Sequence, residues 1–137
     1  MVGRLKYLVD TNVWLELLLE QEQAASVRNF FQAVEGNNLA LTEFSLYSIA
    51  IVLTKLKKDN IFREFILDTI EDSGVTKVRL ENEDLLHLIE IRQNTNLDFD
   101  DAYQYTAAEK HNLTLVSFDS DFDVTVRGKM TPAEVEG

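Results

Sequence analysis

The stretch Lys6-Tyr7-Leu8-Val9-Asp10-Thr11-Asn12 joins a short apolar run to an aspartate and two residues that favour the start of a helix. An apolar run of this length that ends at a polar residue is typical of a buried strand. Apolar residues then recur at helical spacing over positions 13–18, behind a cap supplied by Thr11 or Asn12. The stretch therefore predicts a strand that leads directly into a helix, with Asp10 at the junction.

Strand and helix signals alternate outward from this junction to the end of the chain. Strands are expected over residues 6–9, 39–41, 75–80 and 113–116. Helices are expected over about 23–35, 42–56, 60–72, 82–93 and 98–111. A short edge strand near residues 124–126 or 130–131 would be the fifth strand of the sheet. Such alternation predicts an α/β fold, a three-layer α/β/α sandwich with a mostly parallel central sheet of four to five strands.

The composition fits one globular domain. The length of 137 residues is a common domain size, and apolar and charged fractions of 45% and 27% are ordinary. One proline and five glycines provide no linker, so residues 1–137 are interpreted as a single domain. No apolar stretch reaches the roughly 18 residues of a membrane span, and the apolar run near the N-terminus is too short for a signal peptide. We expect a cytoplasmic protein without a membrane partner.

The absence of cysteine and the negative net charge narrow the kinds of site that the chain can build. Without cysteine there are no disulfides, zinc–thiolate sites or cysteine nucleophiles. A net charge of −11 disfavours binding of nucleic acid through backbone electrostatics alone, so such a partner would need metal ions or a local basic patch. Lys55, Lys57 and Lys58 are the candidates for an RNA-binding patch, although cations also suit the end of a helix.

Acidic residues stand just after several of the predicted strands. Asp10, Glu43 and Asp119 each follow a strand, and Asp101 lies in the first turn of a helix that Asp98 is expected to cap. Because ligands of parallel sheets bind beyond the carboxyl ends of the strands, we expect these side chains to meet. Their mutual repulsion would require a cation, and oxygen ligands without cysteine favour Mg²⁺ or Mn²⁺.

Each of these acidic residues also has an ordinary structural explanation. An aspartate after a strand is often a turn residue or a helix cap, and Asp98 is expected to be only a cap. Asp100 is expected on a solvated helix face, and Asp121 and Asp123 fit a surface loop. Only the joint placement of several carboxylates at one sheet edge indicates a metal site.

Three segments carry a resemblance to a known family: Leu-Val-Asp-Thr-Asn at 8–12, Phe-Asp-Asp-Ala at 99–102 with Thr-Ala-Ala at 106–108, and Leu-Val-Ser-Phe-Asp-Ser-Asp-Phe at 115–122. In this order and spacing, the chain resembles the PIN-domain family from residue 8 to about residue 132. That family consists of Mg²⁺/Mn²⁺-dependent ribonucleases and includes toxins of bacterial and archaeal toxin–antitoxin modules. The resemblance implies an endoribonuclease that hydrolyses RNA phosphodiester bonds, with a possible antitoxin partner and a homodimeric assembly.

The resemblance also implies roles for individual residues. Asp10, Asp101 and Asp119 fall on catalytic metal ligands of the family, and Asp121 is a further candidate ligand. Residues expected to hold these carboxylates through hydrogen bonds are Thr11, Asn12 and Ser117.

The chain departs from the family pattern at one acidic position. The family usually has an acidic residue about two turns into the helix after the second strand, where this chain has Ser48. Glu43 is the nearest acid and lies about one and a half turns earlier. Either Glu43 reaches the site from the start of the helix, which we favour, or the site has one carboxylate fewer and Ser48 only supports it.

The leading interpretation is therefore an endoribonuclease that uses Mg²⁺ or Mn²⁺. The alternative is a catalytically weak or inactive PIN-like module that binds a protein or RNA partner, which Ser48 and the net charge of −11 both favour. A phospho-accepting receiver domain also clusters aspartates at strand ends, but no suitably placed lysine stands at the end of the last predicted strand.

Overall fold

Four parallel strands form one sheet at the centre of the computed structural model, which describes residues 4–136. The strands are β1 (Tyr7–Val9), β2 (Leu39–Thr42), β3 (Thr76–Val78) and β4 (Thr114–Val116). They lie in the order β3-β2-β1-β4, and Leu8 of β1 stands opposite both Ala40 and Leu115. Because all pairs are parallel, the carboxyl ends of the strands meet at one edge.

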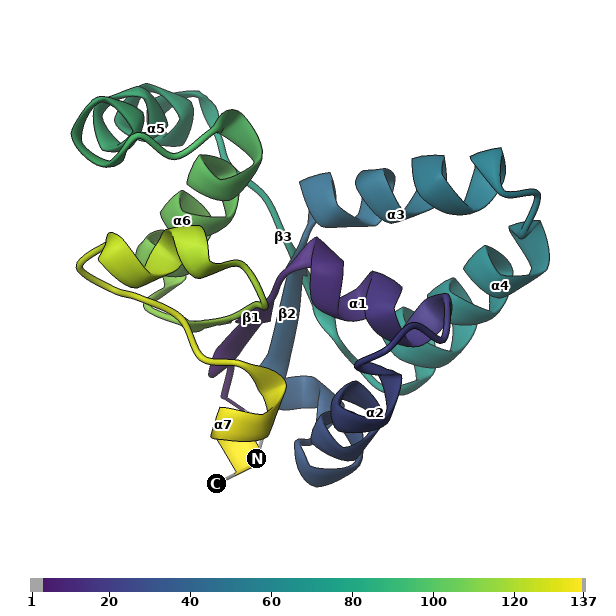
Figure 1. Cartoon of the computed structure of the whole chain (residues 1–137). Helices are drawn as coiled ribbons and strands as arrows, with labels where there is room; N and C mark the ends of the chain where they lie inside the picture. Colours follow the sequence, from purple (N-terminus) through teal and green to yellow (C-terminus); the bar gives the residue numbers. More distant parts are fainter. Residues whose placement is uncertain (1–3, 137) are drawn as a thin grey trace.

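Helices cover both faces of this sheet (Figure 1). One face carries α5 (Asn82–Thr95) and α6 (Phe99–His111). The other face carries α1 (Thr11–Leu18), α2 (Ala24–Ala33) and α3 (Glu43–Lys55). The shorter elements are η1 (Gly36–Asn38), α4 (Asp59–Glu64), the π-helical η2 (Phe65–Asp72), η3 (Ser120–Val124) and α7 (Pro132–Glu136). Within residues 4–136, no helix combines the length and apolarity that crossing a membrane requires.

The alternation of side chains along each strand divides the core into two parts. Leu8 packs with α5 and α6, whereas the next residue, Val9, packs with α1, α2 and α3. Successive strand residues point to opposite faces, and Ala40 and Leu41 on β2 divide in the same way. All four side chains are fully buried. The predicted three-layer α/β/α sandwich with a parallel sheet is therefore confirmed, with four strands.

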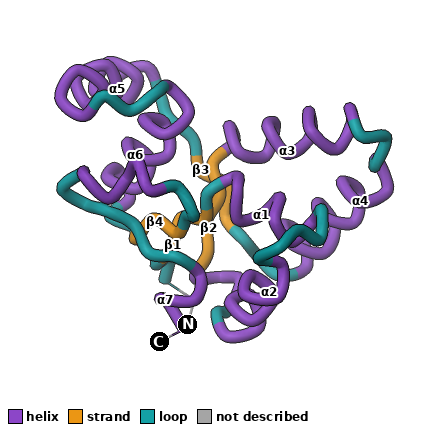
Figure 2. The backbone as a smooth tube through the Cα atoms, viewed as in Figure 1, coloured by secondary structure: helices purple, strands orange, loops and turns teal. Residues whose placement is uncertain are grey.

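Two predicted elements differ from the structure, and Figure 2 shows the second difference, since it draws strands only in the central sheet. The helix expected over residues 60–72 is divided into α4 and the π-helical η2. The prediction of a strand near residues 124–126 is wrong. The Asp119 carboxylate caps a 3₁₀ turn, η3, which extends to Val124. Val126 is fully exposed. At the other predicted position of this strand, residues 130–131, Met130 forms only an isolated parallel bridge with Val116 of β4.

Candidate metal centre

Asp10 and Ser117 meet because β1 and β4 are neighbouring strands that end at the same sheet edge. The Asp10 N–H donates to the Val116 carbonyl at 2.9 Å, and the Ser117 hydroxyl donates to Asp10 Oδ2 at 2.7 Å. Asp10, rather than the predicted Thr11 or Asn12, is also the N-cap of α1, since its Oδ1 accepts from the Thr11 N–H at 2.8 Å. The strand-to-helix junction therefore fixes the Asp10 carboxylate at the end of an interior strand, where it is only 6% exposed.

A buried glutamine on α6 holds the same carboxylate from another element. Gln104 Nε2 donates to Asp10 Oδ1 at 2.8 Å and to Ser45 Oγ at 2.6 Å. Gln104 Oε1 accepts from the Thr42 hydroxyl at 2.8 Å. Ser45 Oγ also lies 2.8 Å from the Thr11 hydroxyl, which closes the network. These bonds tie the carboxyl ends of β1 and β2 to α6, so the orientation of Asp10 depends on three separate elements.

Neither Gln104 nor Ser45 is among the site residues predicted from the sequence. Gln104 follows Asp101 by three positions, so the two side chains lie on the same side of α6. A glutamine between two tyrosines, one turn after a predicted ligand, is the signal that could have identified it. Ser45 has a weaker signal: its N–H donates at 2.9 Å to the cap residue Thr42, as the third residue of many capped helices does.

Ser117 also connects Asp10 to the acidic residues that follow β4. Its hydroxyl oxygen accepts from the Asp119 N–H at 2.9 Å and from Asn12 Nδ2 at 3.3 Å. Asn12 Oδ1 in turn accepts from the Phe118 N–H at 3.3 Å. Asn12 and Ser117 thus hold the segment after β4 against the start of α1.

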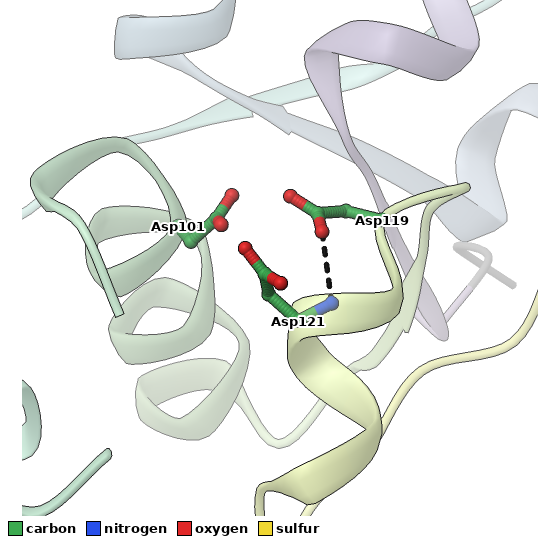
Figure 3. A group of neighbouring side chains, drawn as sticks. All are labelled: Asp101, Asp119 and Asp121. Atoms are coloured by element: carbon green, nitrogen blue, oxygen red, sulfur yellow. Dashed lines mark hydrogen bonds between the residues drawn. The ribbon is translucent and has the colours of Figure 1, made fainter. Parts of the chain in front are cut away.

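Asp101, Asp119 and Asp121 gather into one group of carboxylates (Figure 3). Each offers one carboxylate oxygen, and these oxygens all lie within 4.8 Å of one another. Asp101 lies in the first turn of α6, and its N–H donates at 3.0 Å to the cap residue Asp98. Asp119 caps η3 by accepting from the Asp121 N–H at 2.9 Å. The 3₁₀ turn therefore brings Asp121 to the group, although its sequence position also fitted a surface loop.

Burial and neighbouring charges disfavour ionisation of Asp101 and Asp10. Burial raises the pKa of Asp101 to about 8, assisted by a hydrogen bond with Asp119 and by the negative charges of Asp119, Asp98 and Asp10. Burial also raises the pKa of Asp10, although three hydrogen bonds to its carboxylate act in the opposite direction. Within residues 4–136, no lysine or arginine forms an ion pair with Asp10, Asp101, Asp119 or Asp121. A group of oxygen ligands with excess negative charge suits a hard divalent cation.

A hollow of about 220 Å³ opens beside Asp10 and Asp101, and Ser48 and Asp100 also line it. Among the described residues, Glu43 belongs neither to the lining of this hollow nor to the group of three carboxylates. The charge of Glu43 acts elsewhere, because Glu81 and then Glu43 raise the pKa of Arg79. The predicted reach of Glu43 into the site therefore has no support in this arrangement, and the α3 wall presents the Ser48 hydroxyl instead.

The predicted basic patch lies apart from the carboxylates. Lys55 ends α3, and Lys57 and Lys58 follow it, all three exposed. Lys57 and Lys58 line a separate hollow of about 400 Å³ together with the first residues of α4. Less than two turns of α3 lie between Ser48, which lines the hollow beside Asp10, and Thr54, which lines this one, and the two hollows share no lining residue. RNA binding by the three lysines stays a prediction.

Solved structures with the same fold include proteins of toxin–antitoxin systems. A toxin–antitoxin complex from Klebsiella pneumoniae is similar with a TM-score of 0.75 and 19% identity, over 94% of this chain and 99% of that one. FitAcB from Neisseria gonorrhoeae gives a TM-score of 0.75 and 19% identity, over 92% and 97% of the two chains. VapC20 from Mycobacterium tuberculosis is described as a toxin that cleaves the sarcin–ricin loop. It gives a TM-score of 0.78 and 14% identity, over 93% of this chain and 100% of that one. At such identities the likeness establishes the fold alone.

Among curated proteins, none matches this chain in sequence. The family model of the PIN domain, in contrast, matches residues 7–127. The matched region begins with β1 and includes Asp10, Asp101, Asp119 and Asp121, and it covers most of the chain. The chain therefore belongs to the PIN domain family.

Proposed function

We propose that this PIN domain is a Mg²⁺- or Mn²⁺-dependent endoribonuclease that hydrolyses phosphodiester bonds in RNA. The observation that carries the proposal is the group formed by Asp101, Asp119 and Asp121, with the buried Asp10 acting on it electrostatically. Carboxylates this crowded strongly disfavour one another's ionisation unless a cation neutralises them. Membership of a family whose members are typically nucleases gives further support.

The four aspartates would hold one or two divalent ions, and the surrounding residues keep the aspartates in place. A divalent cation in such a site supplies an activated water nucleophile and neutralises charge on the phosphoryl group. Gln104 and Ser117 each donate to a different oxygen of Asp10, so its carboxylate cannot rotate without breaking hydrogen bonds. Asp119 is fixed through its own N–H and through the cap that it provides to η3. The chain's contribution is thus a preorganised set of oxygen ligands.

A catalytically weak PIN module that binds a protein or RNA partner is the second candidate. Ser48 favours it, because the hollow beside Asp10 has a hydroxyl where the family pattern has an acid. Fewer negative ligands would weaken metal binding. Asp121 counts against this candidate, because it adds a carboxylate from η3 to the ligand set.

The proposal extends to assembly as a homodimer and to a role as the toxin of a toxin–antitoxin pair. Apolar side chains on two helices are exposed: Tyr47 and Ile51 on α3, and Leu86 and Ile89 on α5, each 51–67% exposed. Exposed apolar residues that recur on one helix face are typical of protein interfaces. One of the structural neighbours was itself solved as a toxin–antitoxin complex.

The enzymatic proposal can be tested by incubating the purified protein with single-stranded RNA and Mn²⁺. We expect cleavage at internal positions of the RNA, and EDTA should abolish it. The Asp101→Asn variant should cleave at least about 100-fold more slowly, because a ligand carboxylate is removed. The matched control is Asp72→Asn, which changes the charge equally at an exposed position at the end of η2. Cleavage that survives in Asp101→Asn would come from a contaminant and would remove the support for the proposal.

Calorimetric titration with Mn²⁺ separates the two candidates. Binding by the wild type that Asp101→Asn and Asp121→Asn both weaken supports the enzyme. Asp123→Asn serves as the control on the same 3₁₀ turn, because Asp123 pairs with Lys129 at 3.0 Å rather than with the other carboxylates. A wild type that binds neither Mn²⁺ nor Mg²⁺ would favour the non-catalytic module.

A further inference from the structure

A second hollow adjoins the metal centre and shares part of its wall. Asn12 and Leu15 line both the hollow beside Asp10 and a neighbouring one of about 440 Å³, here called the side groove. Sites of roughly 300–1,000 Å³ accommodate small organic ligands. Because the two hollows share these lining residues, the side groove lies next to the hollow beside Asp10.

The side groove is built from one face of α1 and two neighbouring loops. Asn12, Leu15, Glu16 and Leu19 recur at the spacing of one helix face. The turn after α1 contributes Gln21 and Gln23, both exposed. The segment after β4 contributes the half-buried Phe118. Its lining therefore combines an aromatic ring, aliphatic side chains and amides.

Phe118 stands directly beside the metal centre. It lies between Ser117, which donates to Asp10, and Asp119, a member of the carboxylate group. The Phe118 N–H donates to Asn12 Oδ1 at 3.3 Å, which ties the aromatic residue to the shared wall. Phe118 lines the side groove, so this hollow holds an aromatic ring from the residue that directly precedes Asp119.

The chemistry of the side groove suits a nucleobase better than a phosphate. No lysine or arginine is among its lining residues within the described part of the chain, and Glu16 would repel a phosphate. A carboxylate can instead accept from the exocyclic amino group of a base, and glutamine amides pair with base edges. Because the net charge of −11 also opposes attraction of the RNA backbone, base contacts offer an alternative source of affinity.

The backbone of the turn that carries Gln21 and Gln23 is held in place by hydrogen bonds to Glu16. Glu16 Oε1 accepts from the Gln23 N–H at 2.8 Å, and the Gln21 N–H donates to the Glu16 carbonyl at 2.9 Å. The turn that carries both glutamines is therefore fixed to the last part of α1. Preorganisation of this kind lowers the entropic cost of binding.

We propose that the side groove is a nucleobase subsite, in which Phe118 stacks on the base next to the scissile phosphate and Gln21 and Gln23 hydrogen-bond to its edge. This inference rests on the proposed ribonuclease function and narrows its substrate to single-stranded RNA. A base inside a duplex is already stacked and paired, whereas an unpaired base can turn onto an aromatic ring.

The test measures affinity rather than cleavage. Fluorescein-labelled single-stranded RNA oligonucleotides, each with one abasic nucleotide at a different position, are titrated with the protein in Ca²⁺ and followed by anisotropy. We expect one position where loss of the base weakens binding about tenfold, as base–aromatic stacking predicts. Phe118→Leu should weaken binding of the intact RNA about tenfold and should no longer distinguish that abasic RNA, whereas Phe118→Tyr should behave like the wild type.

The controls separate stacking from a structural role of Phe118. Phe62→Leu makes the same substitution at another partly buried phenylalanine, which lines a hollow on α4 and η2. Gln21→Ala and Gln23→Ala alter exposed residues. Each should weaken binding of the intact RNA several-fold without changing the affinity for the abasic RNA. Equal affinity for every abasic RNA, or an equal loss by Phe118→Leu for intact and abasic RNA, would overturn the subsite.

Failure of the subsite and failure of the enzymatic proposal give different results. If Mn²⁺-dependent cleavage occurs but no abasic position matters, the side groove is not a base subsite and the nuclease remains. If the abasic effect appears without cleavage in Mn²⁺, the subsite remains and the catalytic proposal falls. A wild type that binds no RNA in Ca²⁺ would refute the subsite outright.

Discussion

Gln104 Nε2 lies 2.8 Å from Oδ1 of Asp10, although the two residues are 94 positions apart in the chain. Both side chains are buried, so the amide replaces the water that would otherwise solvate this carboxylate. Because the same amide also bonds to Ser45 and Thr42, a single side chain couples the sheet edge to α6. Its removal should therefore affect both stability and metal binding.

Replacing Gln104 with leucine keeps the volume approximately and removes all its hydrogen bonds. The free energy of unfolding should fall by about 1–3 kcal/mol, because buried polar partners lose their bonds. Affinity for Mn²⁺ should fall about 10- to 100-fold, as expected when a ligand loses its orienting neighbour. Urea unfolding and calorimetry measure the two effects. The control is Gln93→Leu at an exposed position near the end of α5, which should change neither quantity.

Ser48→Glu would place a carboxylate in the hollow that Asp10 and Asp101 line. We expect Mn²⁺ affinity to rise roughly tenfold, because another negative oxygen ligand is added. The metal-free protein should become less stable, because the new charge repels the others. Thr54→Glu, an exposed position on the same helix, makes a similar charge change away from the site. Unchanged Mn²⁺ affinity in Ser48→Glu would mean that this wall does not face the ion.

Stability of the metal-free protein should decrease as pH rises. Asp101 has a pKa of about 8 in the folded protein, against about 3.9 for an unfolded aspartate. Between these values the folded state binds the extra proton, so the free energy of unfolding falls from about pH 4 to about pH 8. Urea unfolding in EDTA at several pH values measures this slope, and Asp101→Asn should flatten it. A slope of the opposite sign would contradict the raised pKa.

The same proton should compete with the metal ion. Mn²⁺ affinity should therefore rise up to about tenfold per pH unit below about pH 8, with release of a proton on binding. Calorimetry in buffers with different ionisation enthalpies measures the proton release directly. Binding that is independent of pH would show that Asp101 is not a ligand.

The exposed apolar side chains on α3 and α5 should mediate self-association. Ile51→Glu and Leu86→Glu should each shift the protein towards the monomer, because a charge in an apolar interface costs several kcal/mol. Light scattering over a range of protein concentrations measures the shift. Leu67→Glu is the matched control, since Leu67 is 48% exposed and lies on η2. A wild type that is monomeric at all concentrations would remove this prediction.

The local patterns in the sequence were sufficient for the sheet and for the position of Asp10. A short apolar run that ends at Asp10-Thr11-Asn12 leaves few alternatives to a strand followed by a helix, although the cap is Asp10 rather than the predicted Thr11 or Asn12. The same reasoning placed β2 and β4 and the cap at Asp98. It failed in the tail, because side-chain capping by Asp119 decides the course of the chain there rather than apolar alternation.

The contacts within the site depend on which elements the fold brings together, and local patterns do not contain that information. Gln104 acts on Asp10 only because α6 packs against the sheet near the end of β1. Glu43 directly follows β2, but it lies outside the lining of the hollow, whereas Ser48 lies within it. Position just after a strand end therefore identified Asp10 and Asp119 but did not separate them from Glu43.

The interior position of β1 has a consequence for the synthesis of this protein. Asp10 is translated about a hundred residues before Thr114, yet β1 pairs with β4, which begins only at Thr114. Asp119 and Asp121 are translated later still. A nascent chain that ends before β4 carries Asp10 without Ser117 and without two of the three clustered carboxylates, so the proposed metal site cannot assemble until Asp121 has been translated.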